Sequence, residues 1–152
     1  MDAKYFKFSV AEPEPVNLIN NGTFDSDTLW YYSMAPGWVI AEGVATYDDV
    51  DSWKHLSQAQ VDMNSPGVEA DASYTLTFDM TSVGDANVGL MIYSYTGSEV
   101  TYVEYANYSV GEVVINFTAP AVIQNGGLKF LIYKGGGARP VTLDNISLIK
   151  TS

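Results

Sequence analysis

Apolar and polar residues alternate along most of this chain. The clearest example is the segment 74–80 (Y-T-L-T-F-D-M), in which each bulky residue is followed by a polar one. Because successive side chains of a strand point to opposite faces, this pattern predicts a strand with one buried and one exposed face. No segment shows the sustained period of 3.6 residues that an amphipathic helix requires. The pattern therefore predicts an all-β protein.

Roughly nine strand segments are expected, separated by turns rich in Gly, Pro and Asn. They are residues 17–24 (ending in an Asn-Gly turn), 38–47 (a hairpin turning at Glu42-Gly43), 56–63, 74–80, 88–95, 100–108, 112–118, 128–133 and 141–149. Residues 25–37 are expected to form a polar loop with an aromatic cluster. Many short strands at this spacing are typical of a β-sandwich or a barrel.

The last strand segment contains a carboxylate between apolar residues. Strict alternation over residues 141–149 would place Asp144 on the same side as Ile146 and Leu148. A carboxylate among apolar side chains must be paired, hydrogen-bonded or bound to a metal, since burying it alone is too costly. We therefore expect Asp144 to help hold a structural cation against residues 17–25, which would join the two ends of the domain.

The first sixteen residues differ from the rest. Tyr5, Phe6 and Phe8 lie in the first ten residues, and A-E-P-E-P follows. Two prolines among acidic residues favour a stiff, extended spacer that pairs poorly in sheets. We place a boundary near Val16, which divides the chain into an arm and spacer (residues 1–16) and a domain (residues 17–152). Three interpretations of the first ten residues stay open: an edge strand, a disordered leader, or an arm that docks on another subunit.

Composition excludes several classes of function. The chain has 18 acidic against seven basic side chains and a net charge of −11, which disfavours nucleic acid and anionic membranes as partners. It has no cysteine and a single histidine, His55, so disulfides, thiolate sites and histidine clusters are excluded. No apolar run approaches the ~18 residues of a membrane span, and the N-terminus lacks the apolar core of a secretory signal.

Several motifs resemble those of a known family. Residues 17–25 (N-L-I-N-N-G-T-F-D) resemble the opening of the jelly-roll carbohydrate-binding modules of families 4, 9 and 22. Further matches follow in the same order as in that family: Gly37-Trp38, S-Y-T-L-T-F-D at 73–79, V-I-N-F-T-A-P at 114–120 and L-D-N-I-S-L at 143–148. The resemblance covers residues 17–149 and implies an antiparallel, galactose-binding-like sandwich of two sheets. It says less about the ligand, because this fold hosts many functions.

The resemblance also implies a structural calcium ion. In that family a calcium ion commonly links the opening region to the last strand. Asp144 matches the acidic ligand of the closing motif, and Asp25 matches the acidic position after Asn-Gly-x-Phe. Oxygen ligands suit a hard cation such as Ca²⁺. In the alternative interpretation, Asp25 caps a turn and Asp144 bonds backbone amides.

An aromatic strip on one sheet face is the candidate ligand site. If Val88, Leu90 and Ile92 face the core, the alternate positions of that segment form a Met-Tyr-Tyr strip. The next segment adds either Tyr102 or, on its other parity, Tyr105 and Asn107. Sugar rings stack on aromatic side chains, and polar neighbours bond their hydroxyls. The candidate residues are Met91, Tyr93, Tyr95 and Tyr102, with Trp30 and Trp53 in loops at the rim. Cross-strand tyrosine pairing and a protein contact are the competing explanations.

No constellation of catalytic residues stands out. Glycosidases need two facing carboxylates, but the acidic residues Asp48, Asp49 and Asp51 cluster in a loop. We therefore expect a non-catalytic binding or decoration module.

Two classes of function remain. The first is a phage virion surface protein, in capsid decoration or fibre adhesion, that binds glycans and docks on other virion proteins through its arm. A homo-oligomer would fit this class. The alternative is a carbohydrate-binding module cut from a secreted polysaccharide-degrading enzyme, and therefore extracellular. The first is preferred because the chain starts with Met, has no signal and ends soon after its last strand.

Overall fold

The computed structural model describes residues 9–32, 37–47, 54–82, 87–93, 100–107, 110–121, 123, 127–133 and 141–152. Within these ranges the chain forms strands and one short 3₁₀ turn, η1 (Gln60–Asp62). The strands are β1 (Tyr31–Tyr32), β2 (Trp38–Ala41), β3 (Val44–Tyr47), β4 (Lys54–Gln58), β5 (Ser73–Ser82), β6 (Asn87–Tyr93), β7 (Val100–Asn107), β8 (Gly111–Thr118), β9 (Gly127–Tyr133) and β10 (Val141–Lys150). The described part contains no helix that is long and apolar enough to cross a membrane.

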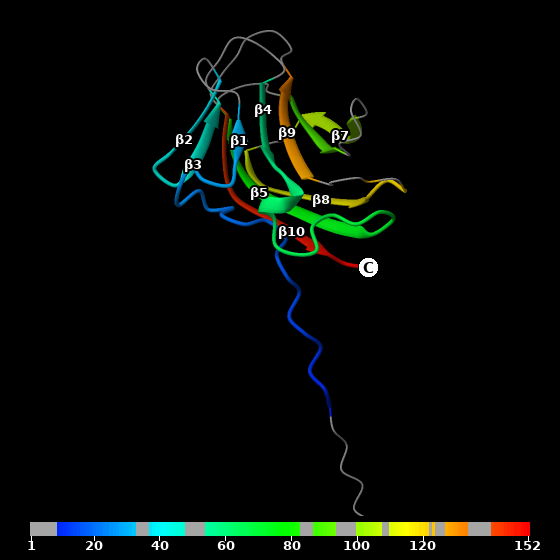
Figure 1. The fold of residues 1–152 in the computed structure, drawn as a ribbon. Coiled ribbons are helices and arrows are strands. Elements are labelled where there is room, and N and C mark those ends of the chain that lie inside the picture. The colour runs from blue at the N-terminus through cyan, green and yellow to red at the C-terminus, as the bar shows by residue number, and fades with distance from the viewer. Residues whose placement is uncertain are drawn as a thin grey trace, which may run out of the picture.

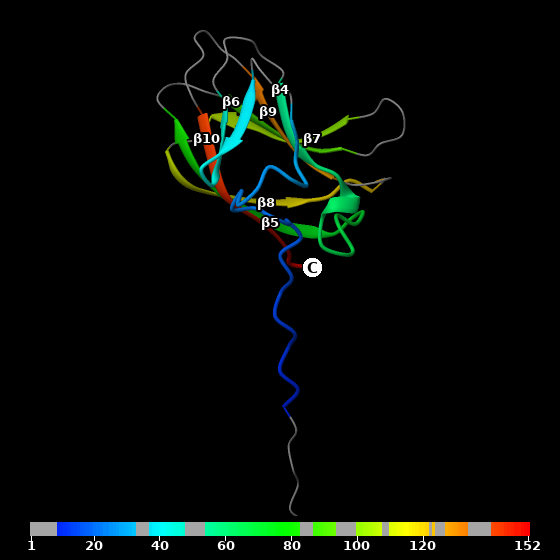
Figure 2. The ribbon, with the colours of Figure 1, turned by 60° about the vertical axis from the view of Figure 1, so that its left-hand side comes forward.

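The strands form two five-stranded antiparallel sheets that face each other (Figures 1 and 2). The order is β1-β4-β9-β6-β7 in the first sheet and β2-β3-β10-β5-β8 in the second. β10 is the central strand of the second sheet, between β3 and β5. The predicted all-β antiparallel sandwich is confirmed.

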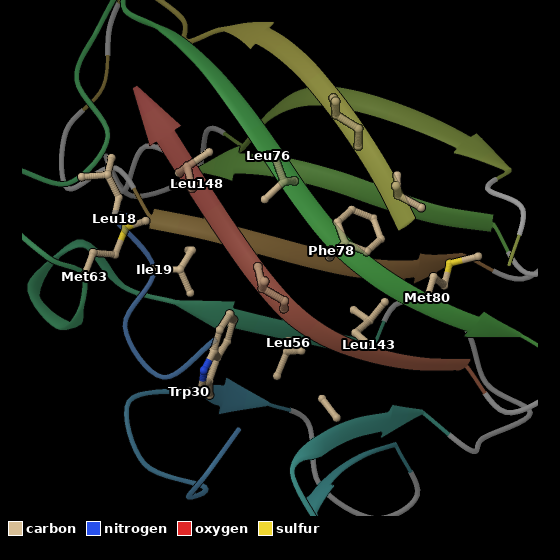
Figure 3. Packing of buried hydrophobic residues seen from close by; sticks show 14 of the residues in the cluster. Leu18, Ile19, Trp30, Leu56, Met63, Leu76, Phe78, Met80, Leu143 and Leu148 are labelled. Atoms are coloured by element: carbon tan, nitrogen blue, oxygen red, sulfur yellow. The ribbon is translucent and has the colours of Figure 1, made fainter. Parts of the chain in front are cut away.

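The core lies between the sheets and follows the predicted alternation of β5. Tyr74, Leu76, Phe78 and Met80 are at most 1% exposed. Figure 3 shows Leu76 and Phe78 in the core cluster that also contains Leu143 and Leu148 of β10 and Leu56 of the opposite sheet. The β2–β3 hairpin also turns where the sequence predicts. Glu42 and Gly43 both have positive φ, at 54° and 77°, as a two-residue hairpin turn of type I′ requires.

A bulge in β10 changes the face on which Asp144 lies. Val141 and Leu143 are buried, but the next buried residues are Ile146 and Leu148, so one extra residue interrupts the alternation. The bulge lies at Asn145, whose backbone has a left-handed φ of 51°. Asparagine tolerates this conformation better than most residues do. Asp144 is therefore half-buried on the outer face, and the prediction that it shares the side of Ile146 and Leu148 is wrong.

Residues 17–24, which we call the opening segment, do not form the predicted strand, but the turn expected at Asn21-Gly22 is present. Among the described residues its only ladder contact is the bridge between Asn17 and Ile149, and Asn21 and Phe24 have positive φ. The predicted strand 56–63 is similarly divided into β4, which ends at Gln58, and η1. The sequence also missed β1, which lies in the segment predicted as a loop.

The opening segment is hydrogen-bonded to β10, so the two ends of the domain are joined. The backbone N–H of Leu18 donates to Leu148 O at 2.8 Å, and that of Ile146 donates to Gly22 O at 3.0 Å. The side chain of Asn17 completes the contact: its Oδ1 accepts from the backbone N–H of both Ile19 and Leu148, each at 3.0 Å. The predicted joining of the two ends is therefore provided, in part, by direct hydrogen bonds.

Residues 9–16 form no strand and are exposed, and they run away from the sandwich in an extended path (Figures 1 and 2). The arm residues Tyr5, Phe6 and Phe8 lie outside the described residues. The division at residue 16 therefore stays a prediction.

The Asn17 contact can be tested by substitution. Asn17→Ala removes the acceptor of two backbone N–H groups at buried residues, and an unsatisfied buried donor costs about 1–3 kcal/mol. We expect the free energy of unfolding, measured by urea titration, to fall by roughly 2–4 kcal/mol. Asn17→Asp keeps an acceptor oxygen in place and should lose much less. Equal losses in the two variants would show that the acceptor is not what stabilises the contact.

Candidate functional site

β1 and β4 together show which face of the first sheet is exposed. Leu56 is fully buried in the core, so its neighbours His55 and Ser57 occupy the alternate positions. Ser57 is itself only 3% exposed, but Tyr31, directly opposite it in β1, is 57% exposed, which identifies this side as the outer face. Directly opposite residues of antiparallel strands share a face, so the register extends this assignment across the sheet. The positions in line with Ser57 are Tyr31, Lys129, Met91 and Tyr102. These five positions, which we call the outer row, cross all five strands.

Further positions on the same face flank the outer row. On one side they are Leu131, Gly89 and Tyr105, in line with His55, and beyond them Tyr133, Asn87 and Asn107. On the other side they are Tyr93, Gly127 and Val100. The outer face therefore combines tyrosine positions with lysine and asparagine positions.

The sequence alone did not decide which residues of β7 lie on the outer face, and a register shift explains why. Leu90 pairs with Glu104 and Met91 pairs with Tyr102, so Val103 is an extra residue. The shift brings Tyr102 and Tyr105 to the same face, although their spacing along the chain would separate them. The sequence analysis also did not assign Tyr31, Lys129 and Tyr133 to this face. Their positions on it depend on pairings between strands that are distant along the chain.

The predicted ligand residues have different outcomes. Met91, Tyr93 and Tyr102 occupy register positions on the outer face, and their use in binding stays a prediction. Tyr95 and Trp53 lie outside the described residues. Tyr31 lies on the outer row, and its side chain is 57% exposed.

The prediction that Trp30 stacks on a ligand is wrong. Its side chain is only 5% exposed and packs against Phe24, with ring centroids 5.2 Å apart. Its indole N–H donates to Asn21 O at 2.9 Å. Trp30 thus closes the core beneath the opening segment (Figure 3), because a large ring with one polar group is stabilised by burial when that group has a partner.

The sheet that carries the outer row is also attached to the opening segment. Gln58, fully buried at the end of β4, accepts a hydrogen bond from the backbone N–H of Asn20 and donates one to Asn20 O at 2.7 Å. The hydroxyl of Ser57 donates to Tyr31 O at 3.3 Å, which connects β1 to β4. These bonds fix the edge of the outer face at which Tyr31 lies.

Two groups in the described part of the chain have a clearly shifted pKa, and both lie away from this face. Lys150 forms an ion pair with Glu69, with 2.6 Å between Nζ and Oε2, and this hydrogen bond raises the pKa of Lys150. Burial raises the pKa of Tyr74, whose hydroxyl accepts from the backbone N–H of Glu69. Both groups lie at the end of the second sheet, where they connect a loop to β5 and β10.

The two predicted calcium ligands lie in segments that contact each other. Asp25 follows the opening segment, and its Oδ2 accepts from the Thr23 hydroxyl at 2.8 Å. Asp144 precedes the β10 bulge, and its Oδ1 accepts from the backbone N–H of Asn145 at 2.7 Å. The bond of Asp144 is to a backbone amide, as the alternative interpretation expects, whereas that of Asp25 is to a side-chain hydroxyl, and the role of both acids as calcium ligands stays a prediction. Within the described ranges no three His, Asp or Glu side chains group in a way that would hold a metal ion, so further ligands would have to be carbonyl or hydroxyl oxygens.

Several solved structures of carbohydrate-binding modules share this architecture. No protein-family model and no curated protein sequence matches the chain. Among solved structures, one described as "CBM4 structure and function", a family 4 module, superposes with a TM-score of 0.60 at 16% identity, covering 88% of this chain and 99% of that one.

Two further solved structures contain oligosaccharides. A variant of a family 29 carbohydrate-binding module complexed with mannohexaose has a TM-score of 0.59 at 12% identity, covering 92% of this chain and 93% of that one. The CBM22-1–GH10 modules of a Clostridium thermocellum endo-1,4-beta-D-xylanase, complexed with xylohexaose, have a TM-score of 0.59 at 10% identity, covering 90% of this chain and 28% of that longer one. The chain therefore has the jelly-roll fold of these carbohydrate-binding modules, as its motifs implied.

Proposed function

We propose that the protein is a non-catalytic carbohydrate-binding module whose outer face binds a linear oligosaccharide or polysaccharide. The observation that carries the proposal is the outer row, which runs across all five strands of one sheet. Neighbouring strands lie about 4.8 Å apart, so the row is roughly 19 Å long and spans several sugar rings. The oligosaccharide complexes among the solved structures of this fold support the same class of ligand.

The residue types on this face suit a sugar chain. Tyrosine and methionine offer apolar surface for the C–H faces of the rings, and Tyr31 is already exposed there. Lysine, asparagine and tyrosine side chains offer hydrogen-bond partners for ring hydroxyls. A face on which apolar and hydrogen-bonding side chains follow a line favours an extended chain of sugars over a compact ligand.

The similar structures favour one of the two predicted classes of function. One of them combines such a module with a second module in a single xylanase chain. This supports the interpretation as a module of a polysaccharide-degrading enzyme, with a site of action outside the cell. The role at a virion surface stays a prediction that no comparison supports.

Substitution on the outer face tests the glycan proposal. Tyr93→Ala combined with Tyr102→Ala should weaken binding of xylohexaose, cellulohexaose or mannohexaose, whichever binds best, by about 30-fold or more. Loss of an aromatic anchor typically costs about 2 kcal/mol or more. Calorimetric titration measures the affinity, and mass spectrometry of the recovered sugar should find it uncleaved.

The matched control is Val39→Ala combined with Val114→Ala, two exposed positions on the second sheet. Its affinity should equal that of the parent chain. Unchanged affinity in the tyrosine variant would overturn the assignment of the outer face, and cleaved sugar would overturn the non-catalytic role.

A structural calcium ion held by Asp25 and Asp144 is a further part of the proposal. Binding at one hundred times the dissociation constant stabilises a fold by about 2.7 kcal/mol, which for a chain of this size raises Tm by roughly 5–10 °C. Chelation should therefore lower the Tm of the parent chain by that amount. Asp144→Asn should melt at the same temperature with and without chelator, whereas the exposed control Asp27→Asn should stay sensitive. A parent chain that melts identically in calcium and in chelator would exclude the ion.

A further inference from the structure

In the described part of the molecule, the second sheet ends in a long strand with an unpaired edge. β8 (Gly111–Thr118) pairs only with β5 among the strands that the structure describes, through eight successive residue pairs without a register shift. The free side of such a strand presents backbone N–H and C=O groups that pair readily with another extended segment.

β8 lacks the features that usually prevent such pairing. Protected edge strands are short, bulged or carry lysine or proline. Of the other edge strands, β1 has two residues, β2 has four, and β7 has a register shift. β8 has neither lysine nor proline, and Val114 at its centre is 54% exposed. It is therefore the most receptive edge in the described part of the molecule.

The outer side of this edge is strongly negative at one end. Glu112 of β8 lies directly opposite Asp79 of β5, which in turn lies directly opposite Asp144 of β10. Like charges directly opposite each other are unfavourable in a sheet. An approaching strand with positive charge would relieve this repulsion.

The N-terminal arm has the sequence that this edge requires. Residues 5–10 (Y-F-K-F-S-V) alternate, so that as a strand Phe6, Phe8 and Val10 would share one side and Lys7 would lie on the other. The first ten residues contain two of the seven basic side chains in a protein with a net charge of −11. Beside β8, the apolar side would extend the row of Val113 and Ile115, and Lys7 would lie on the side of Glu112.

The path of residues 9–16 directs the arm away from its own β8. The chain leaves the sandwich at Asn17, which pairs with β10 on the side away from β5 and β8. Val10 is 89% exposed, and the P-E-P spacer favours an extended chain. Because residues 9–16 lead away from the domain, the residues before them can reach a neighbouring molecule.

We infer that the arm of one molecule adds as a strand to the free edge of β8 in a second copy of this chain. Main-chain hydrogen bonds give such a contact its strength, and the alternating side chains give it specificity. The contact is heterologous, so it joins copies head to tail into rings or open chains. It is independent of the proposed glycan site, which lies on the other sheet.

Native mass as a function of concentration tests this inference. The full chain should form oligomers, and a variant lacking residues 1–10 should be monomeric with an unchanged Tm. A synthetic peptide of residues 1–10 should then bind the shortened chain saturably. Glu112→Lys with Val114→Lys places two positive charges on the free edge, and it should weaken peptide binding about tenfold or more.

The control carries the same change of charge at the opposite edge of the same sheet: Val39→Lys with Glu42→Lys, both at exposed positions. Its peptide affinity should equal that of the shortened parent. Oligomers that persist without the arm would overturn the inference in favour of another interface. A full chain that stays monomeric while the peptide still binds would mean that the arm pairs within its own molecule, which also overturns it. Equal peptide binding by the β8 variant and its control would exclude β8 as the receptor.

Discussion

The opening segment contacts β10 so closely that one position has no room for a side chain. A Cβ added at Gly22 would lie 2.0 Å from Ile146 O, well inside the contact distance. At the same place the backbone N–H of Ile146 donates a hydrogen bond to Gly22 O, and that of Leu148 donates to the side-chain oxygen of Asn17. The side chain of Gln58, in the facing sheet, forms two hydrogen bonds with the backbone of Asn20. The opening segment therefore connects the central strand of one sheet to a strand of the other, and both the core and the outer face depend on this contact.

The sequence predicted those parts of the fold that follow from local alternation. β5 and the β2–β3 hairpin were found correctly because burial and turn chemistry are visible over a few residues. Two bulges were missed, near Asn145 in β10 and at Val103 in β7. A bulge shifts the alternation by one residue, and its position is determined by pairing with distant strands. For the same reason the side of Asp144 and the grouping of Tyr102 with Tyr105 required the structure.

The sequence predicted which types of residue the candidate site contains, but not all of the particular residues that form it. A strip of tyrosine and methionine on one strand was evident from the sequence, and the register places further tyrosine positions beside it. Trp30 shows the opposite error, since an aromatic residue in a polar segment was taken to be exposed, whereas its hydrogen bond to Asn21 O makes burial favourable. Which strands adjoin, and what a loop covers, are properties of the whole fold.

The pairing of Asn17 with Ile149 places the start of the sandwich beside a residue near the end of its last strand. A unit whose entry and exit lie together can be spliced into a surface loop of a host protein with little distortion of either partner. Joining the same two points by a short peptide would permit new termini elsewhere in the chain. The sandwich is thus suited to being grafted as an insert as well as appended at the end of a polypeptide.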